Sequence, residues 1–334
     1  MARFKVVVSD HAFSNVDPER RILEPLGAEV IERQCQSLEE LLPIARDADA
    51  LLVTYVKPIG EELFKANPRL RVVVRYAIGI ETLDIPAATR YGILMVNVPE
   101  YCLDEVSDHT IALFFALARK VVISDKKARS GDWNLLFLKP LPKLQGKTVG
   151  FLGFGRIGQK VVKKLGSMDL QFVYYDPYVQ QEQVENAQKV SLEEVLRRSD
   201  FLSIHAPETG ETKHILNRDT LALMKPTAFL INTARGGLVD TDALVSALQA
   251  GQLAGAALDV IENTESLPAN HPFCFMDNVI LTPHSAWYSD ESEVELQIIA
   301  AEEVAKALRG ESPKALLNPE VLQMDRWRSA QKVR

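Results

Sequence analysis

Residues 147–159, KTVGFLGFGRIGQ, contain three glycines that directly follow a short apolar run. The run, residues 148–152, is rich in β-branched and aromatic side chains, which favours a strand buried on both faces of a sheet. Gly153, Gly155 and Gly158 have the spacing GxGxxG, typical of the turn between strand and helix in a dinucleotide-binding unit. This stretch therefore predicts an α/β fold for the second half of the chain.

Each glycine has a separate predicted role. Gly153 permits the tight turn, Gly155 lets the backbone approach a pyrophosphate, and Gly158 lets the helix over residues 156–166 lie close to its strand. The N-terminus of that helix offers free N–H groups and the positive end of a dipole to the phosphates.

A second predicted strand, residues 171–175, ends at Asp176, eighteen residues after Gly158. A carboxylate in this place can accept both hydroxyls of an adenosine ribose and would repel a 2′-phosphate, so NAD is favoured over NADP. The alternative is that Asp176 only caps a helix or forms a turn before Pro177. The order of strand, loop, helix, strand and acid favours the dinucleotide site.

The chain has 334 residues, about twice a typical domain, and predicts two domains. Short apolar strands alternate with amphipathic helices in both halves, a pattern typical of parallel sheets covered on both faces. We therefore expect an α/β protein with two doubly wound parallel-sheet domains. The strands expected are residues 5–9, 29–32, 50–53, 71–75 and 94–97, and then 148–152, 171–175, 201–204, 228–232, 255–260 and 279–282.

Two long helices are expected at the domain boundaries. Residues 103–130 lack proline and predict one helix that crosses between the halves, and residues 290–308 predict a last helix that returns to the first. The predicted domains are residues 1–102 with 299–334, for the substrate, and residues 103–298, for NAD. A cleft between two such domains is where a cofactor and a small substrate would meet.

Composition excludes several classes of protein. The longest apolar run, residues 111–118, is too short to span a membrane, and the N-terminus resembles a strand more than a signal peptide, which predicts a cytoplasmic protein. A net charge of −7 argues against a nucleic-acid partner. Cys35, Cys102 and Cys274 lack metal-ligand spacing, so we expect reduced packing residues and no metal.

Catalytic candidates follow strands of the second half, because ligands in open α/β sheets bind beyond the carboxyl ends of the strands. Arg235, in INTARGGLVD, could bind a substrate carboxylate with both arms of its guanidinium, with Gly236 and Gly237 leaving room around it. The alternative for Arg235 is an internal ion pair. His284, in LTPHSAW, could exchange a proton with a substrate hydroxyl, although a lone histidine is more often structural.

An acid beside His284 would raise the pKa of the imidazole and keep it protonated for carbonyl reduction. Glu262 and Glu265 stand in the loop after the strand expected at residues 255–260, and Asp259 is expected on that strand. The alternative for either glutamate is a solvated loop residue.

These residues belong to ordered motifs that extend over nearly the whole chain. Through these motifs the chain resembles the D-isomer-specific 2-hydroxyacid dehydrogenases. In chain order the motifs are GFLGFGRIG, YYDPY, SIHAPETGETKHIL, MKPTAFLINTARGGLVDTDAL, GAALDV and NVILTPHSAW. The resemblance implies a flavodoxin-like and a Rossmann-like domain, a homodimer joined largely through the cofactor domains, and NAD-linked interconversion of a 2-oxo acid and a D-2-hydroxy acid.

The resemblance also implies roles for individual residues. Arg235 would orient the substrate, His284 would be the acid/base, and a glutamate would polarise it. Ile78 and Gly79 would bind the substrate carboxylate through their backbone, with Arg75 nearby, and Trp287 would line the substrate pocket or else anchor the last helix. The cofactor contacts would be completed by Thr110, Arg156, Ile157, Ala206, Thr233, Ala234, Asp259 and Ser285.

One motif departs from the family pattern. The family glutamate usually stands five residues after the aspartate of GAALDV, and here that position is Thr264. We favour Glu265, one residue later, over Glu262 as the partner of His284, and an altered relay is the third possibility.

Two functions are consistent with the motifs. The first is an NAD-dependent D-2-hydroxyacid dehydrogenase. The second is an NAD(H)-sensing, corepressor-like binding protein. Within the family, the chain is most similar to the branch of the C-terminal binding proteins in two segments, HSAWYSDESEVELQ and NVPEYCLDEVSDHT.

Overall fold

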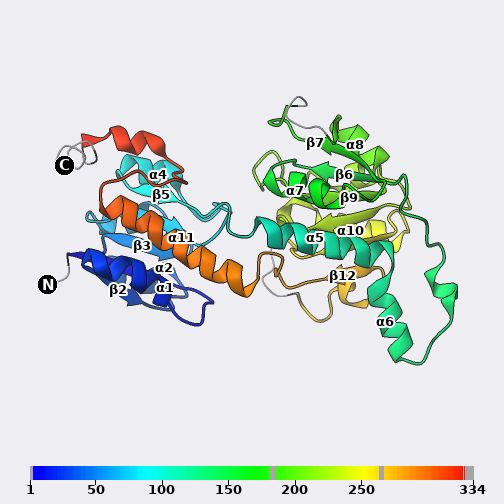
Figure 1. The fold of residues 1–334 in the computed structure, drawn as a ribbon, viewed down its shortest axis with the longest axis horizontal. Helices are drawn as coiled ribbons and strands as arrows, with labels where there is room; N and C mark the ends of the chain where they lie inside the picture. Colours follow the sequence, from blue (N-terminus) through cyan, green and yellow to red (C-terminus); the bar gives the residue numbers. More distant parts are fainter. Residues whose placement is uncertain (1–2, 181–185, 263–266, 326, 328–334) are drawn as a thin grey trace. The chain divides into compact units, whose positions relative to one another are not determined.

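The structure is a computed structural model that describes residues 3–180, 186–262, 267–325 and 327. The chain divides into two compact units (Figure 1). The first consists of Met1–Tyr101 and Ser289–Arg334, and the second of Cys102–Tyr288. Glu265 and Thr264 lie outside the described residues.

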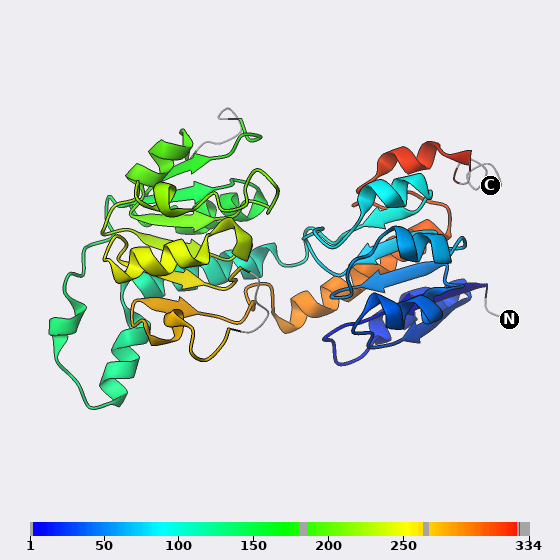
Figure 2. The ribbon, with the colours of Figure 1, turned by 180° about the vertical axis from the view of Figure 1, so that it is seen from behind.

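The first unit is built on a five-stranded parallel sheet with the order β2-β1-β3-β4-β5. This is the flavodoxin-like order, in which the direction of winding reverses between β1 and β3. One face is covered by α1 (Asp17–Leu23) and α11 (Asp290–Leu308), and the other by α2 (Leu38–Ala45), α3 (Glu61–Ala66) and α4 (Ile85–Arg90) (Figures 1 and 2). The strands are β1 (Phe4–Val8), β2 (Ala28–Glu32), β3 (Ala50–Val53), β4 (Val72–Arg75) and β5 (Leu94–Val96).

The helix α11 returns the chain to the first unit, where it packs on α1 and on β4. Ser289 caps it in a reciprocal pair with Ser292, and acidic residues in its first turn favour the positive end of the helix dipole. The unit boundary at Ser289 falls before the expected residue 299, because the whole helix buries its apolar side on one sheet.

The second unit contains a seven-stranded parallel sheet with the order β12-β11-β10-β9-β6-β7-β8. Counted from β6, this is the Rossmann order, with one further strand at the β12 edge. The strands are β6 (Thr148–Leu152), β7 (Gln171–Tyr175), β8 (Gln188–Lys189), β9 (Phe201–Ile204), β10 (Phe229–Asn232), β11 (Gly255–Leu258) and β12 (Val279–Leu281). The fold class expected from the sequence is confirmed.

Helices cover both faces of this sheet. On one face α5 (Leu103–Ala118) and α7 (Arg156–Leu165) enclose an aromatic core, and on the other α8 (Leu192–Arg198), α9 (Arg218–Leu221) and α10 (Thr241–Gln249) enclose an aliphatic one. The single helix expected over residues 103–130 is wrong. Lys120 adopts a left-handed conformation with φ 52°, so the chain breaks into α5 and α6 (Val121–Arg129).

The three cysteines differ in their surroundings. Cys35 and Cys102 are buried, as expected for packing residues, but Cys274 is exposed in a short 3₁₀ turn, so the expectation is wrong there. Among the described residues no group of acids, histidines and cysteines could hold a metal ion. Within the same residues no helix combines the length and apolar character needed to cross a membrane.

A buried polar cluster joins α11 to the rest of the first unit. Glu19, which is fully buried in α1, accepts a hydrogen bond from the Tyr76 hydroxyl at 2.5 Å and another from Gln297 Nε2 at 3.0 Å. Burial raises the pKa of Glu19, while the hydrogen bond from Tyr76 works in the opposite direction. The first unit therefore depends on donors that compensate a desolvated carboxyl group.

We expect Tyr76→Phe to lower the free energy of unfolding by about 1–3 kcal/mol, since it removes a donor from this buried group. The hydroxyl favours the ionised form of Glu19. The loss of unfolding free energy should therefore be greater at pH 8 than at pH 4, because at pH 4 Glu19 approaches its protonated form in both the parent protein and the variant. Urea unfolding measures it, with Tyr91→Phe as control, because Tyr91 donates to the exposed Glu61. Equal losses in the two variants would contradict the account.

Candidate cofactor and catalytic site

The glycine turn between β6 and α7 makes a close backbone contact. Gly153 has φ 80°, and a Cβ built on it would lie 2.6 Å from the backbone nitrogen of Ala206 and 2.7 Å from the carbonyl carbon of His205. A larger residue would have to displace the backbone after β9. Gly153 is therefore required both for the turn and for the approach of this neighbouring loop.

Gly155 and Gly158 differ in their surroundings. Gly155 is the N-cap of α7, and a Cβ built on it would meet no described atom within 4 Å. The helix N-terminus is thus open on this side, which fits a phosphate group held by backbone N–H groups. A Cβ on Gly158 would lie 3.3 Å from the Phe154 ring, consistent with close packing of α7 on its strand. Arg156 and Ile157 form the first turn of this helix.

Asp176 follows β7 and is almost fully buried. One carboxylate oxygen accepts the backbone N–H of Phe154 at 2.8 Å, and the other accepts those of Tyr178 at 2.8 Å and Val179 at 3.1 Å. The turn-forming alternative is thus present in the structure. The same contacts place the carboxylate against the glycine turn, so the two interpretations are compatible.

His205 and Ala206 follow β9 beside Gly153. The imidazole Nε2 lies 2.8 Å from the Ser203 hydroxyl, and the ring stacks on Phe151 with centroids 5.8 Å apart. Burial lowers the pKa of His205 to about 4, because desolvation disfavours the charged imidazolium. His205 is therefore neutral at pH 7.

Thr110 on α5 meets Thr233 after β10. Its hydroxyl donates to the Val106 carbonyl at 2.7 Å and lies 2.9 Å from the Thr233 hydroxyl. Since the single proton of Thr110 is already used, Thr233 must donate to it. This pair fixes the first residue of the loop that leads to Ala234 and Arg235.

The Arg235 turn is held by Asn232, a residue with no role predicted from the sequence. Its side chain accepts the N–H of Ala234 at 3.0 Å and donates to the carbonyl of Arg235 at 2.9 Å. An asparagine at a strand end that bonds its own turn is a frequent sequence signal.

The two glycines after Arg235 lie close to other segments of the second unit. A Cβ on Gly236 would lie 2.2 Å from the carbonyl carbon of Ile261, and one on Gly237 would lie 2.3 Å from a carboxylate oxygen of Glu208. The expected space around the guanidinium stays a prediction. The two glycines allow the chain after β11 and the Glu208 side chain to approach the Arg235 turn.

The His284 turn is organised by Asp259. This residue follows β11 and does not lie on the strand, where it was expected. Its carboxylate accepts the N–H of Ser285 at 2.9 Å and that of Ala286 at 3.0 Å, and its carbonyl accepts the N–H of His284 at 2.9 Å. His284 is exposed and has φ 52°, an uncommon conformation for a residue with a side chain.

Arg235 and His284 leave the same edge of the sheet. They follow β10 and β12, which both pair in parallel with β11 between them. Neighbouring strands lie about 4.8 Å apart, so the two turns start about 10 Å from each other. The geometry brings the two predicted residues to one side of the second unit, with Asp259 between them.

Glu262 is paired with two residues of the loop after β9. Its carboxylate lies 2.7 Å from Nε2 of His214 and 3.9 Å from the Lys213 ammonium group.

Trp287, two residues beyond Ser285, meets Tyr288 edge to face, with ring centroids 5.6 Å apart.

The substrate candidates of the first unit lie in the loop after β4. Arg75 Nη1 donates to the Gly79 carbonyl at 2.8 Å and lies 3.2 Å from a carboxylate oxygen of Glu81. Asn97 after β5 donates to the Ile78 carbonyl at 2.7 Å. Arg75 and Asn97 thus fix the backbone that contains Ile78 and Gly79.

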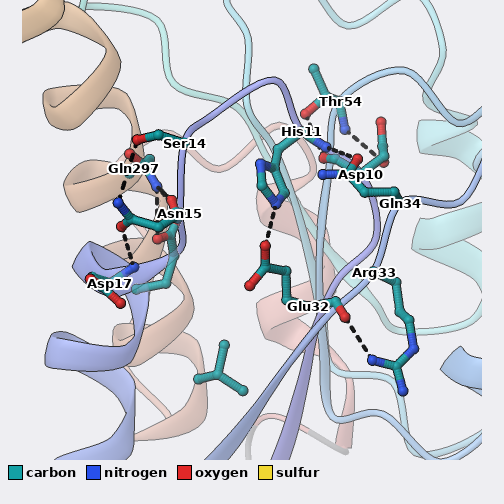
Figure 3. A network of polar contacts seen from close by, with 12 residues as sticks. Asp10, His11, Ser14, Asn15, Asp17, Glu32, Arg33, Gln34, Thr54 and Gln297 are labelled. Carbon is teal, nitrogen blue, oxygen red and sulfur yellow. Dashed lines mark hydrogen bonds and ion pairs between the residues drawn. The ribbon is translucent and has the colours of Figure 1, made fainter.

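A second polar network lies where the winding of the first sheet reverses (Figure 3). Asp10 after β1 accepts the N–H of Thr54 at 3.2 Å and that of Val56 at 3.3 Å, both after β3. His11 Nε2 lies 3.1 Å from Glu32. These bonds tie the loops after β1 and β3 to each other and to the end of β2 within the unit.

Three histidines at this edge of the second unit had no role predicted from the sequence. His109 lies on α5, and His205 and His214 both stand in the loop between β9 and α9. All three lie inside the quoted motifs, as SDHT, SIHAP and TKHIL, so their positions in those motifs were the available signal.

The strand order, the open glycine turn and Asp176 together define a dinucleotide-binding unit of the doubly wound class. Residues 111–286 match the model of the family "D-isomer specific 2-hydroxyacid dehydrogenase, NAD binding domain". The chain belongs to this family. It is an NAD-dependent oxidoreductase that acts on the CH–OH group of 2-hydroxy acids.

Relatives cover most of the chain. A glyoxylate reductase of Thermofilum pendens is 44% identical over 295 residues, 86% of each protein. A D-3-phosphoglycerate dehydrogenase of Methanocaldococcus jannaschii is 37% identical over 301 residues, 89% of this chain and 57% of that protein.

Solved structures share the whole fold. The TT0316 protein from Thermus thermophilus has a TM-score of 0.84 at 34% identity and covers 94% of this chain and 99% of its own. D-lactate dehydrogenase from Aquifex aeolicus, complexed with NAD and lactic acid, has a TM-score of 0.82 at 27% identity, with 92% and 96% covered.

We expect Gly236→Ala to destabilise the second unit by about 1–3 kcal/mol, because the new methyl group would force the backbone at Ile261 and Glu262 to move. The Arg235 turn should move with it, so turnover should fall more than stability alone explains. Gly210→Ala is the control, since a Cβ there meets no described atom within 4 Å. Urea unfolding and initial rates measure both, and matching results for the two variants would contradict the proposed contact.

Proposed function

We propose that this protein reduces a small 2-oxo acid to the D-2-hydroxy acid with NADH, with Arg235 binding the substrate carboxylate and His284 as acid/base. The observation that carries the proposal is the placement of the two turns on one sheet edge, on either side of Asp259. The 44% sequence identity with the glyoxylate reductase of Thermofilum pendens makes glyoxylate, and with it hydroxypyruvate, the first substrates to consider.

The residues around the glycine turn suit NAD. The backbone N–H groups at the start of α7 would hold the pyrophosphate beside Gly155, and Asp176 would accept the adenosine ribose hydroxyls and repel a 2′-phosphate. Ala206, Thr233, Ala234 and Ser285 follow strands or turns at the same edge. When bound, NADH supplies a hydride to C2 of the acid.

Arg235 and His284 would act on the two ends of the substrate. The guanidinium offers paired donors to the carboxylate and holds C2 in place, which a lysine could do only as a point charge. The imidazolium of His284 gives its proton to the carbonyl oxygen as C2 receives the hydride, so a hydroxyl group forms. In the reverse direction the neutral imidazole takes that proton back.

Glu265 is our candidate for the acid that polarises His284, by its position in the family motif. The contact of Glu262 with His214 supports this choice, because it occupies the other candidate. Arg75 would bind near the substrate carboxylate together with the backbone of Ile78 and Gly79, and Trp287 would line the pocket.

Replacement of the glutamates tests the assignment. Glu265→Gln should lower kcat about 10- to 100-fold and move the alkaline limb of the pH profile for reduction to lower pH, because His284 would lose the charge that favours its protonated form. Glu262→Gln serves as the matched control and should leave the profile in place. A shifted profile in Glu262→Gln alone would transfer the role to that residue.

The substrate is tested by loss of NADH absorbance with glyoxylate, hydroxypyruvate, pyruvate and phenylpyruvate. We expect kcat/KM for glyoxylate or hydroxypyruvate to exceed that for phenylpyruvate at least about tenfold, which corresponds to about 1.4 kcal/mol. His284→Gln should lower kcat by about 10²–10⁴. Preference for phenylpyruvate would contradict the small substrate and favour an apolar pocket at Trp287. Tight NADH binding without turnover of any acid would favour the sensor.

We also propose a homodimer that forms through the segment after α5. In α6 no residue is buried, and the segment extends from the sheet with η2 (Leu135–Leu138) (Figure 1). The exposed apolar residues there are Val121, Val122, Trp133, Leu135 and Leu136, the last three exposed by 82%, 72% and 62%. Large apolar side chains gathered in this way are rare on monomers and typical of interfaces.

The double variant Leu135→Lys with Leu136→Glu should shift the protein from dimer to monomer in sedimentation velocity, because it places charges in the apolar contact. Val294→Lys, at an exposed apolar residue of α11, is the control and should leave the mass unchanged. A dimer that survives the double change, or a monomeric parent chain, would contradict the proposal.

The cytoplasmic location, the absence of nucleic-acid and membrane partners, and the similarity to the C-terminal binding protein branch stay predictions from the sequence. They do not enter the proposed mechanism.

A further inference from the structure

His109, on α5, is hydrogen-bonded to the edge of the sheet that contains the candidate catalytic histidine. Its Nε2 lies 3.0 Å from the Thr282 hydroxyl and 3.6 Å from a carboxylate oxygen of Asp259. The His109 side chain is 23% exposed, and the Asp259 side chain is fully buried. Neither the cofactor contacts nor the acid/base step described above uses His109.

The direction of these hydrogen bonds follows from counting protons. Asp259 accepts two backbone N–H groups and a 2.5 Å contact from the Thr282 hydroxyl, so its carboxylate acts only as an acceptor. Thr282 has one proton and gives it to Asp259. The Thr282 oxygen must therefore accept from His109, and Nε2 of His109 must carry a hydrogen.

The resulting chain of donors ends at the His284 turn. His109 donates to Thr282, Thr282 donates to Asp259, and Asp259 binds the backbone N–H groups of residues 284, 285 and 286 through its carbonyl and carboxylate. His284 is held at φ 52°, a conformation that persists only where surrounding contacts impose it. A fixed Asp259 side chain is therefore a condition for the position of His284.

We propose that His109 is a positioning residue for the reaction, which holds Asp259 and the His284 turn in place through the Thr282 hydroxyl. This rests on the proposed role of His284 as acid/base. His109 takes no part in the transfer of the proton or the hydride. Its Nε2–H removes the rotational freedom of the Thr282 hydroxyl, and a fixed hydroxyl leaves Asp259 one arrangement instead of several.

Kinetics of three variants test the role. His109→Leu should lower kcat at least tenfold, displace the pH profile of kcat/KM, and change KM for the 2-oxo acid and Kd for NADH less than threefold. His109→Gln places an amide donor near the position of Nε2 and should recover the profile and most of kcat. His271→Leu removes a histidine that caps a 3₁₀ turn elsewhere in the unit and should match the parent chain.

A double-mutant cycle with Thr282→Val distinguishes a shared pathway from general damage. Thr282→Val removes the hydroxyl and should reproduce the effect of His109→Leu, and the double variant should be no worse than either. Effects on kcat that multiply in the double variant would overturn the proposal. Loss of NADH binding in His109→Leu with an unchanged pH profile would also overturn it.

The protonation site of His109 can be measured without turnover. In the ¹⁵N-histidine-labelled full chain, long-range ¹H–¹⁵N correlations of the neutral imidazole should show the proton on Nε2, and Thr282→Val should relax this preference. A proton on Nδ1 would overturn the proposal. If the parent chain turns over no 2-oxo acid while the proton sits on Nε2, the proposed function fails and the hydrogen-bonded chain still stands.

Discussion

The buried carboxylate of Asp259 holds the candidate site together. Ionised groups are costly to bury unless all their acceptor positions are used, and here the donors are a hydroxyl and two backbone N–H groups. These donors belong to the chain just after β12, so the charge can be satisfied only when the His284 turn is in place. The cost of burying the carboxylate thus becomes a constraint on the position of an exposed histidine. The same dependence links α5 to the site through His109.

Close backbone contacts supply the second constraint. At Gly153 the loop after β9 approaches the glycine turn, and at Gly236 the chain after β11 approaches the Arg235 turn. Both contacts lie at the carboxyl edge of the same sheet, where parallel strands deliver their loops to one side. A side chain at either glycine would push neighbouring loops apart. The loops at this edge therefore contact one another through their backbones, and the functional side chains extend from between them. This arrangement leaves the N-terminus of α7 open beside Gly155.

Much of the fold could be predicted from local patterns. The strands β6, β7 and β9 lie where the apolar runs predict them, because a strand buried on both faces needs a continuous apolar stretch. The break at Lys120 was not predictable from composition, since nothing in the residues 103–130 excludes a continuous helix. The two-residue strand β8 was missed because a short edge strand carries no periodic signal. Among the site residues, Arg235, His284 and Asp176 were proposed from their motifs, whereas the contacts of Asn232 and His109 became known only from the structure.

The sequence by itself determined the class of fold, the dinucleotide turn and the family, because glycine spacing and strand–helix alternation are local and repeat along the chain. Only the tertiary structure decided which contacts those residues make. Gly236 faces Ile261, Glu262 pairs with His214, and His109 reaches Asp259 through Thr282, and each contact joins segments at least 23 residues apart in the chain. Such partners are set by the order of strands in the sheet, which places the ends of β10, β11 and β12 side by side and brings α5 across them.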